Sequence, residues 1–186
     1  MTRYRSLFGG VALAAAVLLV QLLSARAEVM EASSNGFALQ RTIHIAATPE
    51  RVYAALIQPA KWWNPEYTFS GSAANLSLDA RAGGCFCETW SGGSVQHEVV
   101  VYVVPGKTLR LRGALGPFQA QGMDGVLTFS IKAAGDGADL TMENMVGGFM
   151  KGGIGKWPRL ADSMLAEQMI RFKRYLETGS PDAALK

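Results

Sequence analysis

Residues Gly83–Val104 read GGCFCETWSGGSVQHEVVVYVV, and this stretch predicts a β-hairpin. Two runs rich in β-branched and aromatic residues flank the tetrapeptide SGGS at 91–94, and a Gly-Gly pair readily adopts the positive φ angles of a two-residue type I′ turn. If Gly92-Gly93 is the turn, Glu88 lies opposite His97 on the neighbouring strand. We therefore expect an acid and an imidazole to face each other close to a tight hairpin.

Alternation sorts the side chains of this hairpin onto two faces. The more apolar set is expected to face inward, and it contains Phe86, Glu88, Trp90, Val95, His97, Val99, Val101 and Val103. The opposite face is expected to carry Cys85, Cys87, Thr89, Gln96, Glu98 and Tyr102. The hairpin thus places one acid and one histidine within a mostly apolar wall.

Cys85 and Cys87 are separated by a single residue on the first predicted strand. Alternate residues of a strand have Cα atoms about 6.5–7 Å apart with parallel Cβ vectors, which is at or beyond the limit for a disulfide. We therefore expect two unpaired cysteines that pack as small side chains, and an intermolecular or redox role is the next alternative. A metal site would need further ligands, and His97 belongs to the opposite face.

The N-terminus is typical of a secretory signal peptide covering residues 1–27. Arg3 and Arg5 precede an almost wholly apolar run, and Ala-Arg-Ala at 25–27 fits the small-residue pattern of a cleavage site. An uncleaved membrane anchor is the alternative interpretation. Cleavage would leave a polar, flexible lead at 28–36 and a periplasmic or secreted protein.

The charge of the chain changes when this segment is removed. The 186 residues contain 18 Lys and Arg against 15 Asp and Glu. Cleavage removes Arg3, Arg5 and Arg26 but no acid, which leaves 15 against 15. The basic character of the whole chain is therefore no argument for a nucleic-acid partner, nor for a membrane partner after cleavage.

The rest of the chain predicts an α+β domain at 37–179 with a short tail at 180–186. Alternating stretches at 37–46, 74–80, 108–112, 126–133 and 138–145 predict further strands, and Thr48-Pro49 predicts the start of a short helix. A long helix is expected at 158–178, with an apolar stripe of Leu165, Met169, Phe172 and Leu176. An antiparallel sheet of about seven strands needs a cover for its apolar face, and this helix is the available partner.

Four motifs in this order resemble the START-like helix-grip superfamily (SRPBCC). They are ATPERVYAALIQPAKWW at 47–63, GGCFCETW and VQHEVVVYVVPGKTLRLRG at 83–113, LGPFQAQGMDGVLTFSI at 115–131, and RFKRYLETG at 171–179. The chain looks most like the exported bacterial branch described as polyketide cyclase/dehydrase-like or activator-of-heat-shock-protein-ATPase-like. The resemblance implies a strongly curved sheet that wraps the C-terminal helix around a cavity for a hydrophobic or amphipathic ligand.

The first functional hypothesis is therefore a periplasmic small-molecule binding protein. The residues expected to line its cavity are large and apolar: Trp62, Trp63, Phe86, Trp90, Val99, Leu111, Phe118, Met123, Met142, Met169 and Phe172. A protein-interaction role of the heat-shock-activator type is less expected, because ATP-driven cytosolic chaperones are absent after export.

The second hypothesis is an acid–base enzyme of cyclase, dehydratase or isomerase type, with Glu88 and His97 as catalytic residues. Burial and mutual attraction shift their pKa values in opposing ways, so that either group could transfer protons near neutral pH. The alternative is a cross-strand hydrogen bond that only stabilises the hairpin. The sequence contains no nucleotide, phosphate or metal fingerprint, so neither a cofactor nor a metal is expected.

Overall fold

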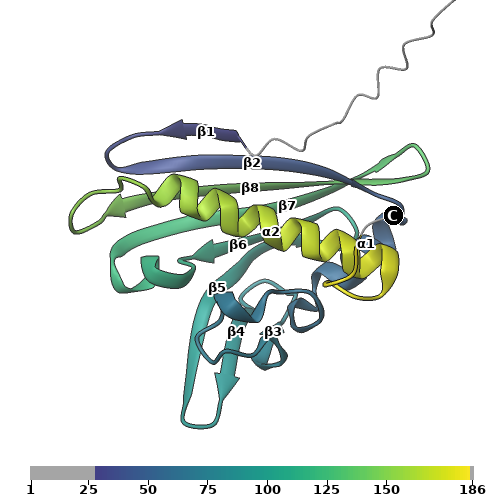
Figure 1. The fold of residues 1–186 in the computed structure, drawn as a ribbon, viewed down its shortest axis with the longest axis horizontal. Coiled ribbons are helices and arrows are strands. Elements are labelled where there is room, and N and C mark those ends of the chain that lie inside the picture. The colour runs from purple at the N-terminus through teal and green to yellow at the C-terminus, as the bar shows by residue number, and fades with distance from the viewer. Residues whose placement is uncertain (1–27, 185–186) are drawn as a thin grey trace, which may run out of the picture.

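The computed structural model describes residues 28–184 and confirms the predicted α+β helix-grip fold (Figure 1). Eight strands of this part of the chain form one antiparallel sheet in the order β1-β2-β8-β7-β6-β5-β4-β3. The strands are β1 (Glu28–Ala32), β2 (Gly36–Ile45), β3 (Leu76–Leu78), β4 (Cys85–Trp90), β5 (Gly93–Val104), β6 (Thr108–Gly113), β7 (Gly122–Ala134) and β8 (Gly137–Phe149). From β3 to β8 each strand pairs with the next one in the chain, which makes a meander. The α1 region connects β2 to β3 at the opposite edge of the sheet, and β8 pairs with β2.

The helices are α1 (Pro49–Leu56) and α2 (Trp157–Thr178), with short 3₁₀ turns η1 (Pro59–Lys61), η2 (Pro65–Tyr67), η3 (Ala73–Asn75) and η4 (Gly116–Ala120). The Thr48 side chain caps α1 by accepting a hydrogen bond from the Arg51 amide, as the sequence predicted. Figure 1 shows α2 running across one face of the curved sheet. Gly179 ends α2 at a φ of 83°, a left-handed conformation that favours glycine.

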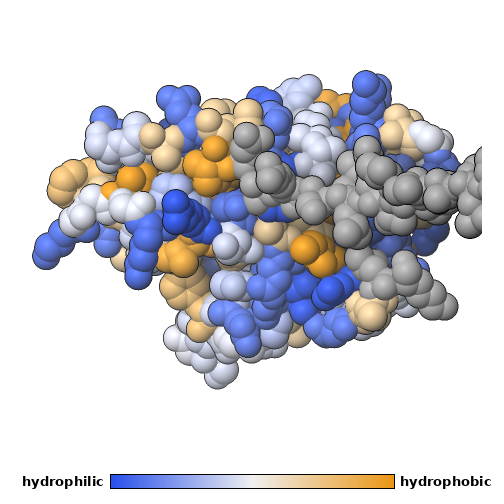
Figure 2. Space-filling model, turned by 45° about the horizontal axis from the view of Figure 1, so that its top comes forward, coloured by the Kyte–Doolittle hydropathy of each residue, from blue (hydrophilic) through white to orange (hydrophobic). Residues whose placement is uncertain are grey.

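The core lies between the sheet and α2. On α2, Leu165, Met169 and Phe172 are buried, whereas Leu176 is only half-buried. On β6, Leu109 and Leu111 point inward and the two arginines between and after them are exposed, as alternation predicted. The face of the molecule in Figure 2 carries hydrophilic residues with smaller groups of hydrophobic ones between them. The apolar residues that repeat along α2 and along the strands therefore mostly pack the helix onto the sheet.

The register of the β4–β5 hairpin differs from the prediction. Trp90 pairs with Gly93, so Ser91-Gly92 is the turn, and Glu88 pairs with Val95 rather than with His97. Gly92 takes a φ of 91° but Ser91 does not have a positive φ, so the turn is not of the expected type I′, which needs a positive φ at both central residues. The turn therefore lies one residue earlier than the Gly-Gly pair indicated.

Two irregularities in β5 change which side chains face inward. One extra residue lies opposite the Phe86–Cys87 step, and a second irregularity follows Val100. Because an extra residue inverts the alternation beyond it, Glu98 is buried although we expected it to be exposed. Val101 is 47% exposed although we expected it to face inward.

The expectation of two unpaired cysteines is wrong. Cys85 and Cys87 form a disulfide, and their Cα atoms are 5.4 Å apart. The prediction assumed a regular, extended strand between the two cysteines. β4 is less extended there, beside the β5 bulge, and the Cα–Cα distance of 5.4 Å is within the range of a disulfide.

The polar lead is also more ordered than expected. Residues 28–32 form β1, which pairs antiparallel with β2 at one edge of the sheet. The predicted signal peptide at 1–27 lies outside the described residues. Within residues 28–184, no helix is both long enough and apolar enough to cross a membrane.

Candidate functional site

A cavity of about 880 Å³ lies between the first half of α2 and the sheet. The segment 63–69 and the connection 113–120, which contains η4, form two of its walls. Strands β4, β5 and β8 contribute Phe86, His97, Glu98, Asn144 and Val146. The cavity exists because the second half of α2 packs directly against the core, whereas the first half leaves space below it.

Three of the eleven predicted ligand-binding residues line this cavity: Trp63, Phe86 and Phe118. Six others are buried in the packed core instead, namely Trp62, Leu111, Met123, Met142, Met169 and Phe172. Trp90 and Val99 are half-buried and lie outside the cavity lining. The prediction was too broad because inward-facing residues line a cavity only where no other side chain fills the space above them.

Trp62 illustrates the difference between the two regions. Its ring packs edge-on against Phe172 with centroids 5.1 Å apart, and its indole nitrogen donates a hydrogen bond to the Ala55 carbonyl oxygen at 3.1 Å. The adjacent Trp63 packs against Phe86 at 5.6 Å between centroids and borders the cavity. The two neighbouring tryptophans therefore serve different parts of the interior.

Glu88 is fully buried and accepts hydrogen bonds from three groups. The backbone amides of Phe69 and Ser70 donate to its two oxygens at 3.0 and 2.5 Å, and His97 Nε2 lies 3.2 Å from Oε2. Burial raises the pKa of Glu88, but the hydrogen bonds from Ser70, Phe69 and His97 outweigh it and lower the pKa below its ordinary value. Glu88 is therefore an ionised carboxylate at neutral pH, and it fixes the loop that carries Phe69.

His97 lines the cavity, whereas Glu88 lies behind it. Its ring packs near Phe86 and Phe69, with centroids 5.0 and 5.9 Å away. Burial lowers the pKa of His97 and the interaction with Glu88 only partly restores it, so the neutral imidazole is favoured. Since an ionised Glu88 can only accept, Nε2 carries the proton and Nδ1 keeps its lone pair.

The predicted contact between Glu88 and His97 is thus confirmed, although the predicted pairing is wrong. The β5 bulge brings His97 back toward Glu88 from a position that is not directly opposite it. Because Glu88 does not line the cavity, the geometry makes it a group that positions His97 rather than one that meets a ligand.

Glu98 is a functional candidate that the sequence reasoning missed. It is 2% exposed and lines the cavity, and its Oε2 has no hydrogen-bond partner among the described residues. Burial, with a smaller contribution from Asp124, raises the pKa of Glu98 to about 8. Glu98 is therefore mostly a neutral carboxylic acid at pH 7.

Gly113 allows this arrangement of Glu98. It pairs with Glu98 across β5 and β6, and a Cβ at this position would lie 2.6 Å from the His97 carbonyl oxygen. A side chain larger than hydrogen would therefore push the strands apart at the point where His97 and Glu98 enter the cavity.

The comparison with known families agrees with this architecture. Residues 37–177 match the family described as polyketide cyclase / dehydrase and lipid transport. The chain belongs to this family. No curated protein sequence matches the chain.

Solved structures show the same fold at low sequence identity. A Rhizobium leguminosarum protein is 18% identical with a TM-score of 0.58, and the match covers 78% of this chain and 97% of that one. A Chromobacterium violaceum protein is 21% identical with a TM-score of 0.54, covering 75% and 96%. DynU16, from the dynemicin biosynthetic locus, is 18% identical with a TM-score of 0.56, covering 79% and 49%.

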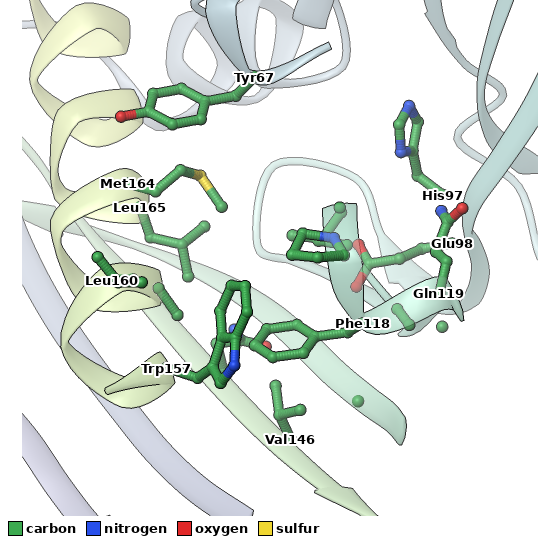
Figure 3. Close-up of a pocket in the computed structure, with 18 of the residues that line it drawn as sticks. Tyr67, His97, Glu98, Phe118, Gln119, Val146, Trp157, Leu160, Met164 and Leu165 are labelled. Atoms are coloured by element: carbon green, nitrogen blue, oxygen red, sulfur yellow. The ribbon is translucent and has the colours of Figure 1, made fainter. Parts of the chain in front are cut away.

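Within this family fold, several cavity residues were not predicted from the sequence. Trp157, Leu160 and Met164 line the cavity from α2, and Figure 3 shows them on the helix side facing Phe118 and Glu98. Their i, i+3, i+7 spacing is a second apolar stripe beside the one that packs the core. This spacing is the signal that could have identified them.

The described residues give no sign of a metal centre. Among residues 28–184, no three His, Cys, Asp or Glu side chains lie together in a way that could hold a metal ion.

Proposed function

We propose that this protein binds a hydrophobic or amphipathic small molecule in the cavity beneath the first half of α2. The observation that carries the proposal is the cavity itself, whose volume of about 880 Å³ is in the range that small-molecule sites occupy. Its walls are mainly aromatic and aliphatic, and the polar groups among them include the buried His97, Glu98 and Asn144. Such a lining favours an apolar body and fixes its orientation through few polar contacts.

We place this function in the periplasm or outside the cell. Two observations support the location: the signal-peptide pattern at 1–27 and the disulfide between Cys85 and Cys87. Disulfides persist mainly in oxidising compartments, and they are rare in the cytosol.

Filling the cavity tests the binding function. Ala161 is buried on α2 and lines the cavity, so the substitution Ala161→Phe places a ring in the space that a ligand would occupy. We expect the affinity for the neutral fluorescent probe N-phenyl-1-naphthylamine to fall by about tenfold or more, measured by fluorescence titration.

The matched control is Ala133→Phe, at an exposed position near the end of β7. It adds the same ring outside the cavity and should bind the probe as the unmodified protein does. Equal probe affinity in a folded Ala161→Phe variant would contradict binding in this cavity.

The second candidate function is acid–base catalysis on a ligand in the same cavity. It is favoured by a neutral His97 that is held through Nε2 by Glu88, next to a carboxylic acid on Glu98. His97 Nδ1 would accept a proton and Glu98 would donate one, as enolisation, cyclisation or dehydration of a carbonyl compound requires. Glu88 would act as a positioning residue in this reaction.

A further inference from the structure

The charged groups at the cavity are of one sign. Among the described residues that line it, the only ones with a formally charged side chain are Glu66 and Glu98, and neither a lysine nor an arginine contributes. His97 also lines the cavity, and burial favours its neutral form. The α2 and η4 walls supply no charged side chain. Any charge that a ligand brings therefore meets carboxyl groups and no fixed cation.

Glu98 is the group best placed to meet such a charge. Figure 3 shows its carboxyl group reaching into the cavity near Phe118. The side chain is almost fully buried, and Oε2 finds no partner among residues 28–184. A buried carboxyl oxygen without a hydrogen bond is costly, so a donor brought by a ligand would satisfy it.

Aromatic rings dominate the remaining lining. Six aromatic side chains border the cavity: Trp63, Tyr67, Phe69, Phe86, Phe118 and Trp157. Phe118 packs against Trp157 with centroids 5.5 Å apart, and Trp63 packs against Phe86 at 5.6 Å, so four of the six rings contact one another in pairs. The faces of such rings carry partial negative charge and attract organic cations.

From these three observations we propose that the ligand is an amphipathic organic amine, whose ammonium group donates to Glu98 while its apolar body packs among the aromatic rings. The inference rests on the proposed binding function and names the ligand class. A fatty acid or another carboxylate is disfavoured, because its anion would be buried beside a carboxyl group with no cation to pair with.

The elements around Glu98 determine how this binding depends on pH. Their titratable and charged groups are Asp124 on β7, Arg112 on β6, which is ion-paired with Asp124 at 2.8 Å, and the pair Glu88–His97 on β4 and β5. Glu66 borders the cavity from η2. Burial and then Asp124 raise the pKa of Glu98 to about 8, so before an amine binds Glu98 is mostly protonated at pH 7.

An ammonium group favours the ionised form of Glu98, and amine binding therefore releases a proton. By linkage, the affinity for an amine rises with pH up to about 8 and then levels off. Alkyl amines remain protonated over this range, since their pKa lies near that of lysine at about 10.4.

Three probes with the same ten-carbon chain test the proposal: decylamine, decanol and decanoate, each titrated into the unmodified protein by calorimetry. At pH 8 we expect decylamine to bind at least about tenfold more tightly than decanol, and decanoate to bind most weakly. The decylamine affinity should increase from pH 6.5 to 8.5, whereas the decanol affinity should not.

Glu98→Gln removes the carboxylate and keeps a side chain of similar shape. It should weaken decylamine by about tenfold and leave decanol within a few-fold, and Glu143→Gln, at an exposed position on β8, should change neither. A thermal melt of each variant verifies folding, and the pH series on the unmodified protein does not depend on any variant. If decanol binds as tightly as decylamine at every pH, the amine inference fails and the binding function stands; if none of the three binds, both fail.

Discussion

Glu88 and His97 form an arrangement in which one residue holds the other. The Glu88 carboxylate is fixed by the Phe69 and Ser70 amides, and it accepts a hydrogen bond from Nε2 of His97. His97 in turn reaches the cavity. An imidazole that is oriented in this way has a defined tautomer and one available lone pair, which a general base needs.

The two histidines of the chain should therefore titrate on opposite sides of the ordinary histidine pKa. Burial lowers the pKa of His97, whereas the hydrogen bonds that His44 donates to Asp139 and Asp136 raise the pKa of this exposed residue. Since Glu88 raises the pKa of His97, Glu88→Gln should lower it further and leave His44 unchanged. NMR titration of the ring protons measures both in one sample.

A His97 that titrates above His44 would contradict this assignment, because it would mean a buried imidazolium–carboxylate pair. Such a result would also remove the neutral base on which the acid–base alternative depends. His44 serves as the internal control for the pH scale and for folding.

The sequence predicted the Glu88–His97 contact but could not have predicted the burial of Glu98. Alternation assigns a residue to a face by counting from the turn, and here the turn starts one residue early and one residue is added in β5. The earlier turn moves the partner of Glu88 by two residues, from His97 to Val95, and so keeps the faces, whereas the added residue inverts the faces beyond it. The residue with the largest consequence for ligand chemistry, Glu98, lies directly after the inserted residue and so appeared on the wrong face.

At the scale of elements, the disulfide and the bulge belong together. Cys85 and Cys87 flank Phe86 on β4, opposite the extra residue in β5 that brings both His97 and Glu98 inward. The link closes a very short stretch of chain, and the entropic stabilisation from a disulfide decreases with the length of the closed segment.

Replacing both cysteines, as Cys85→Ala with Cys87→Ala, should therefore cost little. For so short a loop the chain-entropy relation gives about 1.5 kcal/mol of unfolding free energy, at the low end for native disulfides. Urea denaturation without reductant measures the loss, and the same variant in the presence of reductant is the control, since reductant should then have no effect. A loss several times larger would mean that the disulfide is needed for the β4–β5 register itself.

Elements in which apolar residues recur at a regular spacing were predicted well, and elements without such a repeat were not. The α2 helix and the strands β2, β6, β7 and β8 have clear apolar repeats, and the structure places them within a few residues of the expected bounds. β1 reads EVMEA, which is short and acidic, so nothing in its pattern indicates a strand. β1 forms because its backbone pairs with β2, and this long-range pairing cannot be predicted from the residues of β1 alone.

At the scale of the whole molecule, the cavity results from how far α2 lies from the sheet along its length. Near Met169 and Phe172 the helix packs against Trp62 and the core, and near Leu160 and Met164 it borders open space. The same kinds of apolar side chain occur in both halves. The sequence therefore predicted the helix, the sheet and their contact, but it could not show which half of the contact leaves space for a ligand.

The sequence pattern at 1–27 predicts that this segment is removed during export. Cleavage after Ala27 would leave Glu28 as the first residue, which is where β1 begins, so the whole sheet would be kept in the mature protein. We expect cell fractionation to find the protein in the periplasm or the medium, and mass spectrometry to show the loss of residues 1–27. Substitution of Ala25 and Ala27 by arginine should block processing and retain the precursor at the membrane. An intact N-terminus on the soluble, unmodified protein would contradict export, and the disulfide would then need an origin other than an oxidising compartment.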